Sequence, residues 1–234
     1  MSQTVEKTLS CNVPPMAVGR YHDADKLRQL LPYSVVEMER ARRATMRILS
    51  TFHFRTESNV LVTAQFDEGS QLVGAERAIM SYGMVAVSAD STPWDAGRVE
   101  SILRRFKLVA ALGISETTLD GLEGLGFNPV QLFHGLVIWA RPGAYERLAG
   151  KPGLKVHRWL EIGPAVAMEC SAGAGAHIDR FEWDLSSDNG ELVLNSRLER
   201  SVPFAGYRTG LKARILRGTC KCGNTDPRIV PQAD

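Results

Sequence analysis

The chain has 234 residues, of which 44% are hydrophobic and 23% charged, and 28 basic against 26 acidic residues give a net charge of +2. A chain of this length and composition can bury a sizeable core as one large or two small domains. The near-neutral charge excludes an overall basic field for nucleic acid or an anionic membrane. Because no apolar run reaches the ~18 residues of a membrane span and no signal-peptide core is found, we expect a cytoplasmic protein.

The first fifth of the chain is predicted to hold an irregular arm and two helices. Residues 1–20 contain two consecutive prolines and read as an irregular N-terminal arm. Helical apolar spacing predicts helices over 23–31 and 34–49. Ser34 is followed three residues later by Glu37, a capping-box pattern that indicates a helix start at Ser34.

Strand and helix patterns alternate through the next hundred residues. The predicted strands are 60–64, 84–89, 108–114 and 132–140, and the predicted helices are 69–80, 92–105, 115–122 and 143–148. This rhythm is typical of a parallel sheet with crossover helices. We therefore expect an α/β core over 21–153.

After residue 154 the pattern changes to short alternating segments separated by Gly, Asn and Asp. The segments are 156–162, 181–185, 191–198 and 212–216. Alternation with turn residues between the segments predicts antiparallel strands. We expect a β-rich part over 154–234 that forms one compact unit with the α/β core.

Three of the four cysteines lie in this β-rich part. Four cysteines in a chain of this length do not indicate a disulfide framework, and Cys11 is interpreted as a bystander thiol. Cys170 and His177 flank a glycine-rich turn, and Cys220 and Cys222 form a short knuckle. Three thiolates and an imidazole suit tetrahedral zinc in a closed, structural site. The knuckle is tighter than a standard zinc motif, so a buried apolar cysteine beside a loop of reduced thiols is the alternative.

Five segments of the last third carry a family resemblance. They are GPAVAMEC from Gly163, GAHI at 175–178, GELVLNSRL at 190–198, PFAGYRTGL at 203–211 and CKCGNTDPRI at 220–229. In this order and at these intervals they resemble the phenylacetate–CoA ligase family of adenylate-forming enzymes. The resemblance implies that family's parallel-sheet α/β core, with an aromatic or acyl carboxylate as the ligand class.

The resemblance extends upstream with less specific segments. Residues 59–114 look like the α/β segment of the family. The turn at 137–142 resembles the one that seats the adenine there, with Arg141 in place of its acidic residue.

Several groups that ligase chemistry needs are missing. Adenylation requires charge neutralisation around the α-phosphate. No Gly/Ser/Thr-rich phosphate loop is present, and LLPYSVVEMER stands where the resemblance places it. Leu211 replaces the ribose-binding Asp and cannot accept hydrogen bonds from a ribose, and Gly206 replaces an arginine. No lysine-bearing small domain is expected, so we predict no ATP use and no self-sufficient ligase activity.

A few polar residues remain as candidates for contacts with a ligand. Tyr207 and Arg208 are retained from the family's YRTG motif, and with Arg141 they are the predicted ligand-binding residues. Glu161 matches the acidic member of the family's YGxSE motif and is predicted to pair with Arg208 across the old nucleotide cleft. An ion pair at the surface is the alternative. His134 is predicted either to face a pocket at the strand ends or to be a structural histidine.

Three functional hypotheses follow from these features. The first is a reduced, non-adenylating relative that binds a small acyl or aromatic acid or its thioester, or a protein partner, and self-associates. The second is an enzyme with repurposed, ATP-independent chemistry in a biosynthetic pathway, with Glu161, Arg208 and His134 as catalytic groups. The third is a split ligase whose missing parts are supplied by a separate chain.

Overall fold

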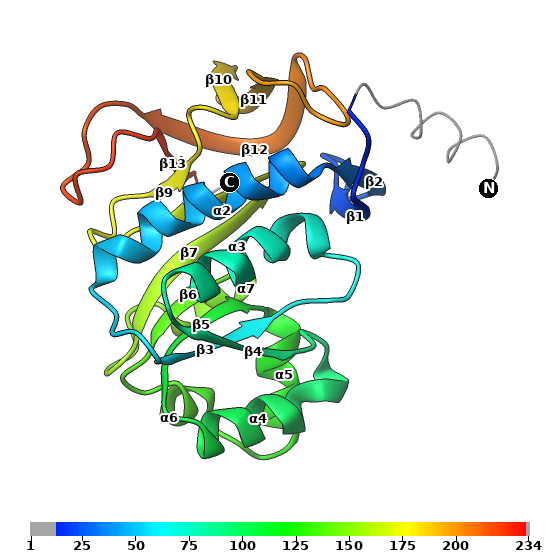
Figure 1. Ribbon diagram of the computed structural model, residues 1–234. Helices are drawn as coiled ribbons and strands as arrows, with labels where there is room; N and C mark the ends of the chain where they lie inside the picture. The colour runs from blue at the N-terminus through cyan, green and yellow to red at the C-terminus, as the bar shows by residue number, and fades with distance from the viewer. Residues whose placement is uncertain (1–12, 233–234) are drawn as a thin grey trace.

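The computed structural model describes residues 13–232, which form one mixed sheet of eleven strands, flanking helices and a separate two-stranded hairpin (Figure 1). Cys11 and most of the predicted N-terminal arm lie outside the described residues. Among the residues that are described, no helix is long and apolar enough to cross a bilayer.

The hairpin of β1 (Ala17–His22) and β2 (Arg28–Tyr33) corrects two predictions. The arm was expected to be irregular through residue 20, and 23–31 was expected to be helical. The local cause is a turn built on Asp23, whose carboxylate accepts the backbone N–H groups of Asp25 and Leu27. Asp side chains that bond the backbone two residues on favour turns over helices.

Helix α2 (Val35–Leu49) begins at the predicted capping box, which is confirmed. The Ser34 hydroxyl accepts the Glu37 N–H at 3.3 Å, and the Glu37 carboxylate accepts the Ser34 N–H at 2.9 Å. Two backbone donors of the first turn are thereby satisfied. The start of α2 is therefore fixed by its own sequence.

The α/β part follows the predicted alternation closely. Its elements are β3 (Asn59–Thr63), α3 (Gly69–Ser81), β4 (Val85–Ala89), α4 (Ala96–Arg105), β5 (Leu108–Ile114), α5 (Glu116–Gly124), α6 (Pro129–Leu132), β6 (Val137–Ala140), α7 (Pro142–Leu148) and β7 (Lys155–Ile162). The five strands pair in parallel in the order β4-β3-β5-β6-β7. The strand predicted over 132–140 is correct only for its last four residues. The segment before it forms α6, with Pro129 in its first turn.

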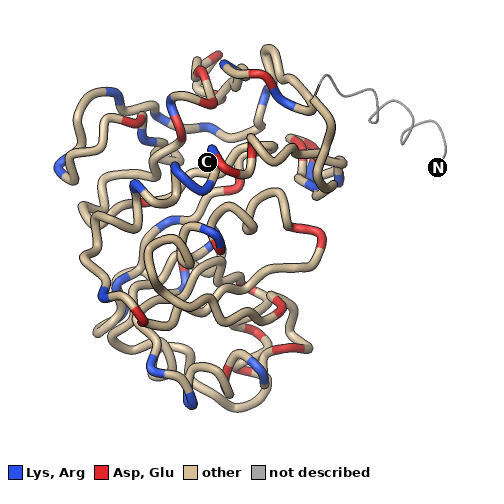
Figure 2. The backbone as a smooth tube through the Cα atoms, viewed as in Figure 1, with Lys and Arg blue, Asp and Glu red and all other residues tan. Residues whose placement is uncertain are grey.

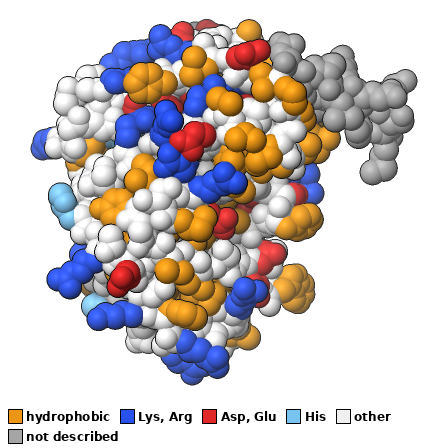
Figure 3. Space-filling model, in the orientation of Figure 1, with side chains coloured by type: hydrophobic (Ala, Val, Ile, Leu, Met, Phe, Trp, Pro, Cys, Tyr) orange, Lys and Arg blue, Asp and Glu red, His pale blue; other side chains and the backbone are white. Residues whose placement is uncertain are grey.

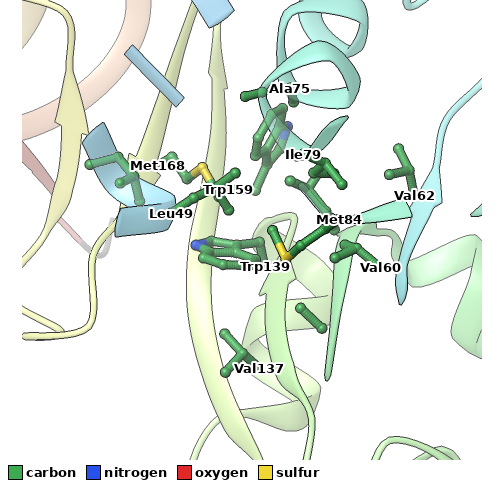
Figure 4. Packing of buried hydrophobic residues seen from close by; sticks show 14 of the residues in the cluster. Leu49, Val60, Val62, Ala75, Ile79, Met84, Val137, Trp139, Trp159 and Met168 are labelled. Atoms are coloured by element: carbon green, nitrogen blue, oxygen red, sulfur yellow. The ribbon is translucent and has the colours of Figure 1, made fainter. Parts of the chain in front are cut away.

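Each face of the parallel strands is covered by helices. Along β3, Val60 and Val62 pack into one core with α2 and α3, whereas Leu61 packs into the other with α4, α5 and α7. This follows from the two-residue repeat of a strand. Figure 4 shows the first core, where Trp139 and Trp159 are almost fully buried between the sheet and the helices.

Strand β7 joins the predicted α/β and β-rich parts into one sheet. It pairs in parallel with β6 and antiparallel with the next strand along the chain. The remaining strands are β8 (Ala165–Glu169), β9 (Ala176–Ile178), β10 (Trp183–Asp188), β11 (Glu191–Ser196), β12 (Tyr207–Leu216) and β13 (Arg228–Pro231). All of their pairings are antiparallel, as predicted, and they enclose a third core.

Helices α2 and α3 approach closely at Gly74, where an added Cβ would lie 2.7 Å from the Ala41 Cβ. We expect Gly74→Ala to destabilise the fold by about 1–3 kcal/mol because the helices must separate. Gly124, a helical glycine with nothing within 4 Å of its Cβ position, is the matched control. There, alanine should stabilise by about 0.4–1 kcal/mol. Urea unfolding measures the change in the free energy of unfolding for both variants. Equal changes at the two positions would contradict the close approach of α2 and α3 at Gly74.

The surface carries both signs of charge. Figure 2 shows Lys and Arg interspersed with Asp and Glu along the backbone. On the face drawn in Figure 3, basic, acidic and hydrophobic side chains also alternate. This distribution agrees with the near-neutral net charge and gives no single-sign field over that face.

Candidate functional site

The four predicted metal ligands converge at one corner of the β-rich part. Cys170 follows β8, His177 lies on β9, and Cys220 and Cys222 lie in the loop between β12 and β13. Because β9 is hydrogen-bonded to both β8 and β13, the sheet itself brings these segments together. Their ligand atoms all lie within 4.8 Å of one another.

The spacing of these atoms suits a tetrahedral metal ion. Zn–S bonds of about 2.3 Å and Zn–N bonds of about 2.0 Å place neighbouring ligand atoms about 3.6–3.8 Å apart. The Cys170 and Cys220 sulfurs are 3.8 Å apart, and the Cys222 sulfur is 3.6 Å from His177 Nε2. The cluster could therefore hold a metal ion with little rearrangement.

The protonation of the cluster also suits a metal. His177 Nδ1 lies 3.0 Å from the Asp226 backbone oxygen, so it donates there and leaves Nε2 as the ligand atom. Burial lowers the pKa of His177, which keeps the imidazole neutral. Burial raises the pKa of Cys170 to about 12, whereas at Cys220 burial is outweighed by hydrogen bonds from Cys222, which lower the pKa. A divalent cation would favour the thiolate at every cysteine.

The cluster is closed to solvent on most sides. Cys170, His177 and Cys220 are at most 4% exposed, and only Cys222 is partly exposed. Four protein ligands with no open position are typical of structural rather than catalytic metal sites. Within residues 13–232 no other group of His, Cys, Asp and Glu is placed to hold a metal.

A second constellation lies at the carboxyl edge of the parallel strands. Glu68 follows β3, Arg141 follows β6, and Glu161 is near the end of β7, so the parallel pairing brings all three to one edge. The Arg141 guanidinium donates to both Glu68 carboxylate oxygens, at 2.8 and 2.6 Å, and lies 3.3 Å from Glu161. Glu68 was not predicted as a partner, because it lies 73 residues from Arg141 and no motif links the two.

The other arginine at this edge is also committed to internal partners. Arg20 on β1 donates to the Asp67 carboxylate at 2.5 Å and to the Gln65 side chain. It also lies 3.5 Å from Glu68. Phosphate binding needs free cationic or backbone N–H donors, and here both arginines are already neutralised by carboxylates.

The buried Glu68–Arg141 pair makes stability depend on pH. Burial alone would raise the pKa of Glu68, but hydrogen bonds and charge from Arg141, with Gln65 N–H and Arg20, together lower it. A lowered folded pKa contributes stability above the unfolded value of about 4.3, and this is lost as pH falls. We expect the stability gap between the parent chain and Glu68→Gln to be largest at pH 7 and to shrink towards pH 3. Urea unfolding across this range measures the gap, and a constant gap would contradict the assignment.

Tyr207, a predicted ligand-binding residue, lies close to this edge. Its ring packs against Gly163, where an added Cβ would lie 2.5 Å from Tyr207 Cε1, and its centroid is 6.0 Å from that of Tyr21. Burial raises the pKa of both tyrosines. Tyr21, Arg141, Glu161 and Gly163 line a cavity of about 210 Å³.

Arg208 and His134 do not join this constellation. The Arg208 guanidinium pairs with Asp188 and Glu191 at the exposed rim of β10 and β11, so the predicted Glu161–Arg208 pair is wrong. Alternating side chains of a strand face opposite sides, which separates Arg208 from Tyr207. His134 precedes β6 and is exposed, so it lies at the amino edge of the parallel strands. The expectation that it faces a pocket at the strand carboxyl ends is wrong.

A further cavity, not predicted from the sequence, lies between α2, α3 and the start of β8. Its volume is about 100 Å³, and its lining is mainly apolar, with Met38, Ile48, Trp159 and Met168 among the walls. Its polar end combines the buried Arg200 with the carboxylates of Glu37, Asp179, Glu182 and Asp226, and Arg200 pairs with Glu37 and Glu182. No periodicity could reveal this cavity, because small residues of two helices and a strand create it together.

Comparison with known proteins now places the fold. No protein-family model matches the chain, and no curated protein matches it either. A solved structure of 2-hydroxyisobutyryl-CoA ligase with 2-HIB-AMP and CoA is similar, with TM-score 0.70, 17% identity, and coverage of 93% of this chain and 57% of the ligase. MbtA of Mycobacterium smegmatis gives TM-score 0.56, 13% identity, and coverage of 94% and 46%. A malonyl-CoA ligase with methylmalonyl-CoA and AMP gives TM-score 0.53, 16% identity, and coverage of 94% and 53%.

The fold is that of the adenylate-forming acyl-CoA ligases. The chain spans about half the length of these three proteins. The large mixed sheet and its flanking helices are thus confirmed as a ligase-type α/β fold. At these identities the likeness concerns the fold, and it does not establish a reaction.

Proposed function

We propose that this protein is a ligase-fold protein that has lost adenylation and binds a small acyl or aromatic carboxylate, or its thioester. The observation that carries the proposal is the Arg141–Glu68 ion pair at the carboxyl edge of the parallel strands. In open α/β sheets this edge is where ligands bind. Here it presents internally neutralised arginines instead of free donors for phosphate.

Position 211 supports the same conclusion. Leu211 packs against the third hydrophobic core, so its side chain is a core element and offers no acceptor to a ribose. The segment LLPYSVVEMER, which the resemblance places at the phosphate loop, forms the end of β2 and the capped start of α2. Neither position provides the polar groups that a nucleotide needs.

The cavity between α2, α3 and the start of β8, which we call the cavity beneath α2, is the proposed site for the acyl or aromatic group. The mainly apolar part of its lining suits the hydrocarbon portion of a small acyl or aromatic compound. The similar ligase structures hold 2-HIB-AMP, CoA or methylmalonyl-CoA, which makes acyl compounds the first class of ligand to test.

We further propose that the metal held by the Cys/His cluster is zinc. The three sulfurs and one imidazole nitrogen match the donor set of structural zinc sites. Bound zinc would fasten the turn after β8 to the loop before β13 and supply folding free energy. It would take no part in a chemical step.

A ligand-binding titration together with an ATP–pyrophosphate exchange assay tests the proposed function. Zinc-loaded protein is titrated with phenylacetate, 2-hydroxyisobutyrate and their CoA esters by ligand-detected NMR, and ATP–pyrophosphate exchange is assayed with the same acids. We expect binding of at least one acid or thioester and no exchange. Exchange above background, or no binding by any compound, would overturn the proposal.

The same samples test the alternative function, an enzyme with repurposed, ATP-independent chemistry. Of its three proposed catalytic residues, only Glu161 lies at the carboxyl-edge cavity, where it is 26% exposed beside Arg141. Conversion of an acid or thioester without ATP, lost on Glu161→Gln, would establish that alternative.

A further inference from the structure

The C-terminal end of α2 is tied to all three segments that carry metal ligands. Arg47, in the last turn of α2, lies 3.0 Å from Asp179, which directly follows β9. Arg47 also lies 2.9 Å from the Asp226 carboxylate, which follows the Cys220–Cys222 knuckle. Thr51, just after the helix, accepts the backbone N–H of Ser171 at 3.1 Å. Ser171 directly follows Cys170.

The same residues form one wall of the cavity beneath α2. His177 and Asp226 line the cavity together with α2 residues, and the Asp226 backbone oxygen accepts the His177 Nδ1–H. A ligand in the cavity would therefore lie between the helix and residues that hold the metal or orient its ligand.

The N-terminal end of α2 is held independently of the metal. Its capping box lies within the helix, Glu37 lies 2.9 Å from Arg200, and Arg40 lies 2.5 Å from Glu182. None of these groups contacts a Cys/His ligand in the described contacts. At the C-terminal end, Ile48 and Leu49 pack in the first core, whereas the polar contacts of Arg47 and Thr51 reach the metal-bearing segments.

We propose that metal occupancy controls access to the cavity by fixing the C-terminal end of α2. With the metal bound, the turn after β8 and the loop before β13 are held together, and both clamp the helix end. Without it, the thiol-bearing segments lose their common ligand and the two clamps separate. The last turn of α2 then loses its polar contacts and opens more often, which increases access to the cavity beside it. The link to ligand binding rests on the proposed function, whereas the helix movement does not.

Amide hydrogen exchange on the full chain tests the helix movement. Zinc-loaded protein is compared with protein treated with a chelator. We expect amides of residues 44–49 to exchange at least tenfold faster without metal, while those of 37–41 change less than twofold. Equal acceleration along the whole helix, or no acceleration, would overturn the proposal.

A variant that keeps the metal distinguishes the proposed helix movement from general unfolding on metal removal. Arg47→Met combined with Thr51→Val removes both clamps and leaves all four ligands, so it should retain one zinc per chain. It should reproduce the local exchange at 44–49 and raise the dissociation rate of any acid bound in the titration at least fivefold. Arg43→Met is the matched control, because Arg43 is on the same helix but pairs with Glu39 at the surface.

The outcomes of the two proposals are distinguishable. Metal-dependent exchange at 44–49 without binding of any acid would reject the proposed function and retain the clamp. Binding of an acid with zinc-independent exchange and an unchanged dissociation rate in the double variant would reject the clamp and retain the function.

Discussion

Cys220→Ala is expected to abolish stoichiometric metal binding and to lower the Tm of the chain by destabilising the β-rich part. The four ligands join segments 50 residues apart in the chain, and a metal bound only in the folded state contributes its binding free energy to folding. Three remaining ligands around a closed, buried site cannot complete the tetrahedron. Metal content by mass spectrometry and thermal unfolding by circular dichroism measure the two effects.

The remaining cysteine provides the matched control. Cys11→Ala removes a thiol that lies outside the described residues and is not among the clustered ligands. It should leave one zinc per chain and an unchanged Tm. Equal loss of Tm in both variants, or full stability of Cys220→Ala without metal, would show that the cluster does not staple the fold.

Arg200→Ala is expected to lower the free energy of unfolding by about 3–5 kcal/mol, the range measured when one partner of a buried ion pair is removed. Arg200 pairs with Glu37 at 2.9 Å and with Glu182, and all three side chains are at most 8% exposed. It also lies over the Trp183 ring, 4.5 Å from its centroid. Without the guanidinium, Glu37 loses its only ion-pair partner among the described residues.

Surface and neutralised variants separate charge burial from lost packing. Arg208→Ala removes an arginine whose side chain is 53% exposed, and exposed pairs contribute about 1 kcal/mol or less. Arg200→Met combined with Glu37→Gln should recover much of the loss, because the Glu37 carboxylate is gone and Glu182 keeps its pair with Arg40. Urea unfolding compares the variants. A loss at Arg200 no larger than at Arg208 would contradict a buried network.

Local sequence signals predicted most elements of the α/β part. The Ser34–Glu37 capping box and the seven-residue strand 108–114 appear where the pattern placed them. The hairpin at 17–33 was missed because the apolar spacing at 23–31 also fits a helix. There the Asp23 side-chain bonds to the backbone decided the structure.

The candidate sites differ in how far the sequence could reveal them. The metal cluster was predicted because each ligand type is chemically distinctive and the motifs stand in a recognisable order. Arg141 and Glu161 were singled out as well, but the ion pairs of Arg141 with Glu161 and Glu68 were not predicted. Glu68 approaches from a distant strand, and no motif links it to Arg141. Arg208 was misassigned because a retained motif does not specify which side of β12 its side chain takes.

The ATP-independent binding of an acyl compound is the central claim. Its most direct measurement is a calorimetric titration of zinc-loaded protein with phenylacetate and phenylacetyl-CoA, each with and without ATP and magnesium. The proposal predicts binding of the acid or its thioester with a Kd that ATP leaves unchanged, and no heat from ATP alone. Saturable binding of ATP, or acid binding that requires ATP, would contradict the proposal and favour ATP-dependent ligase activity.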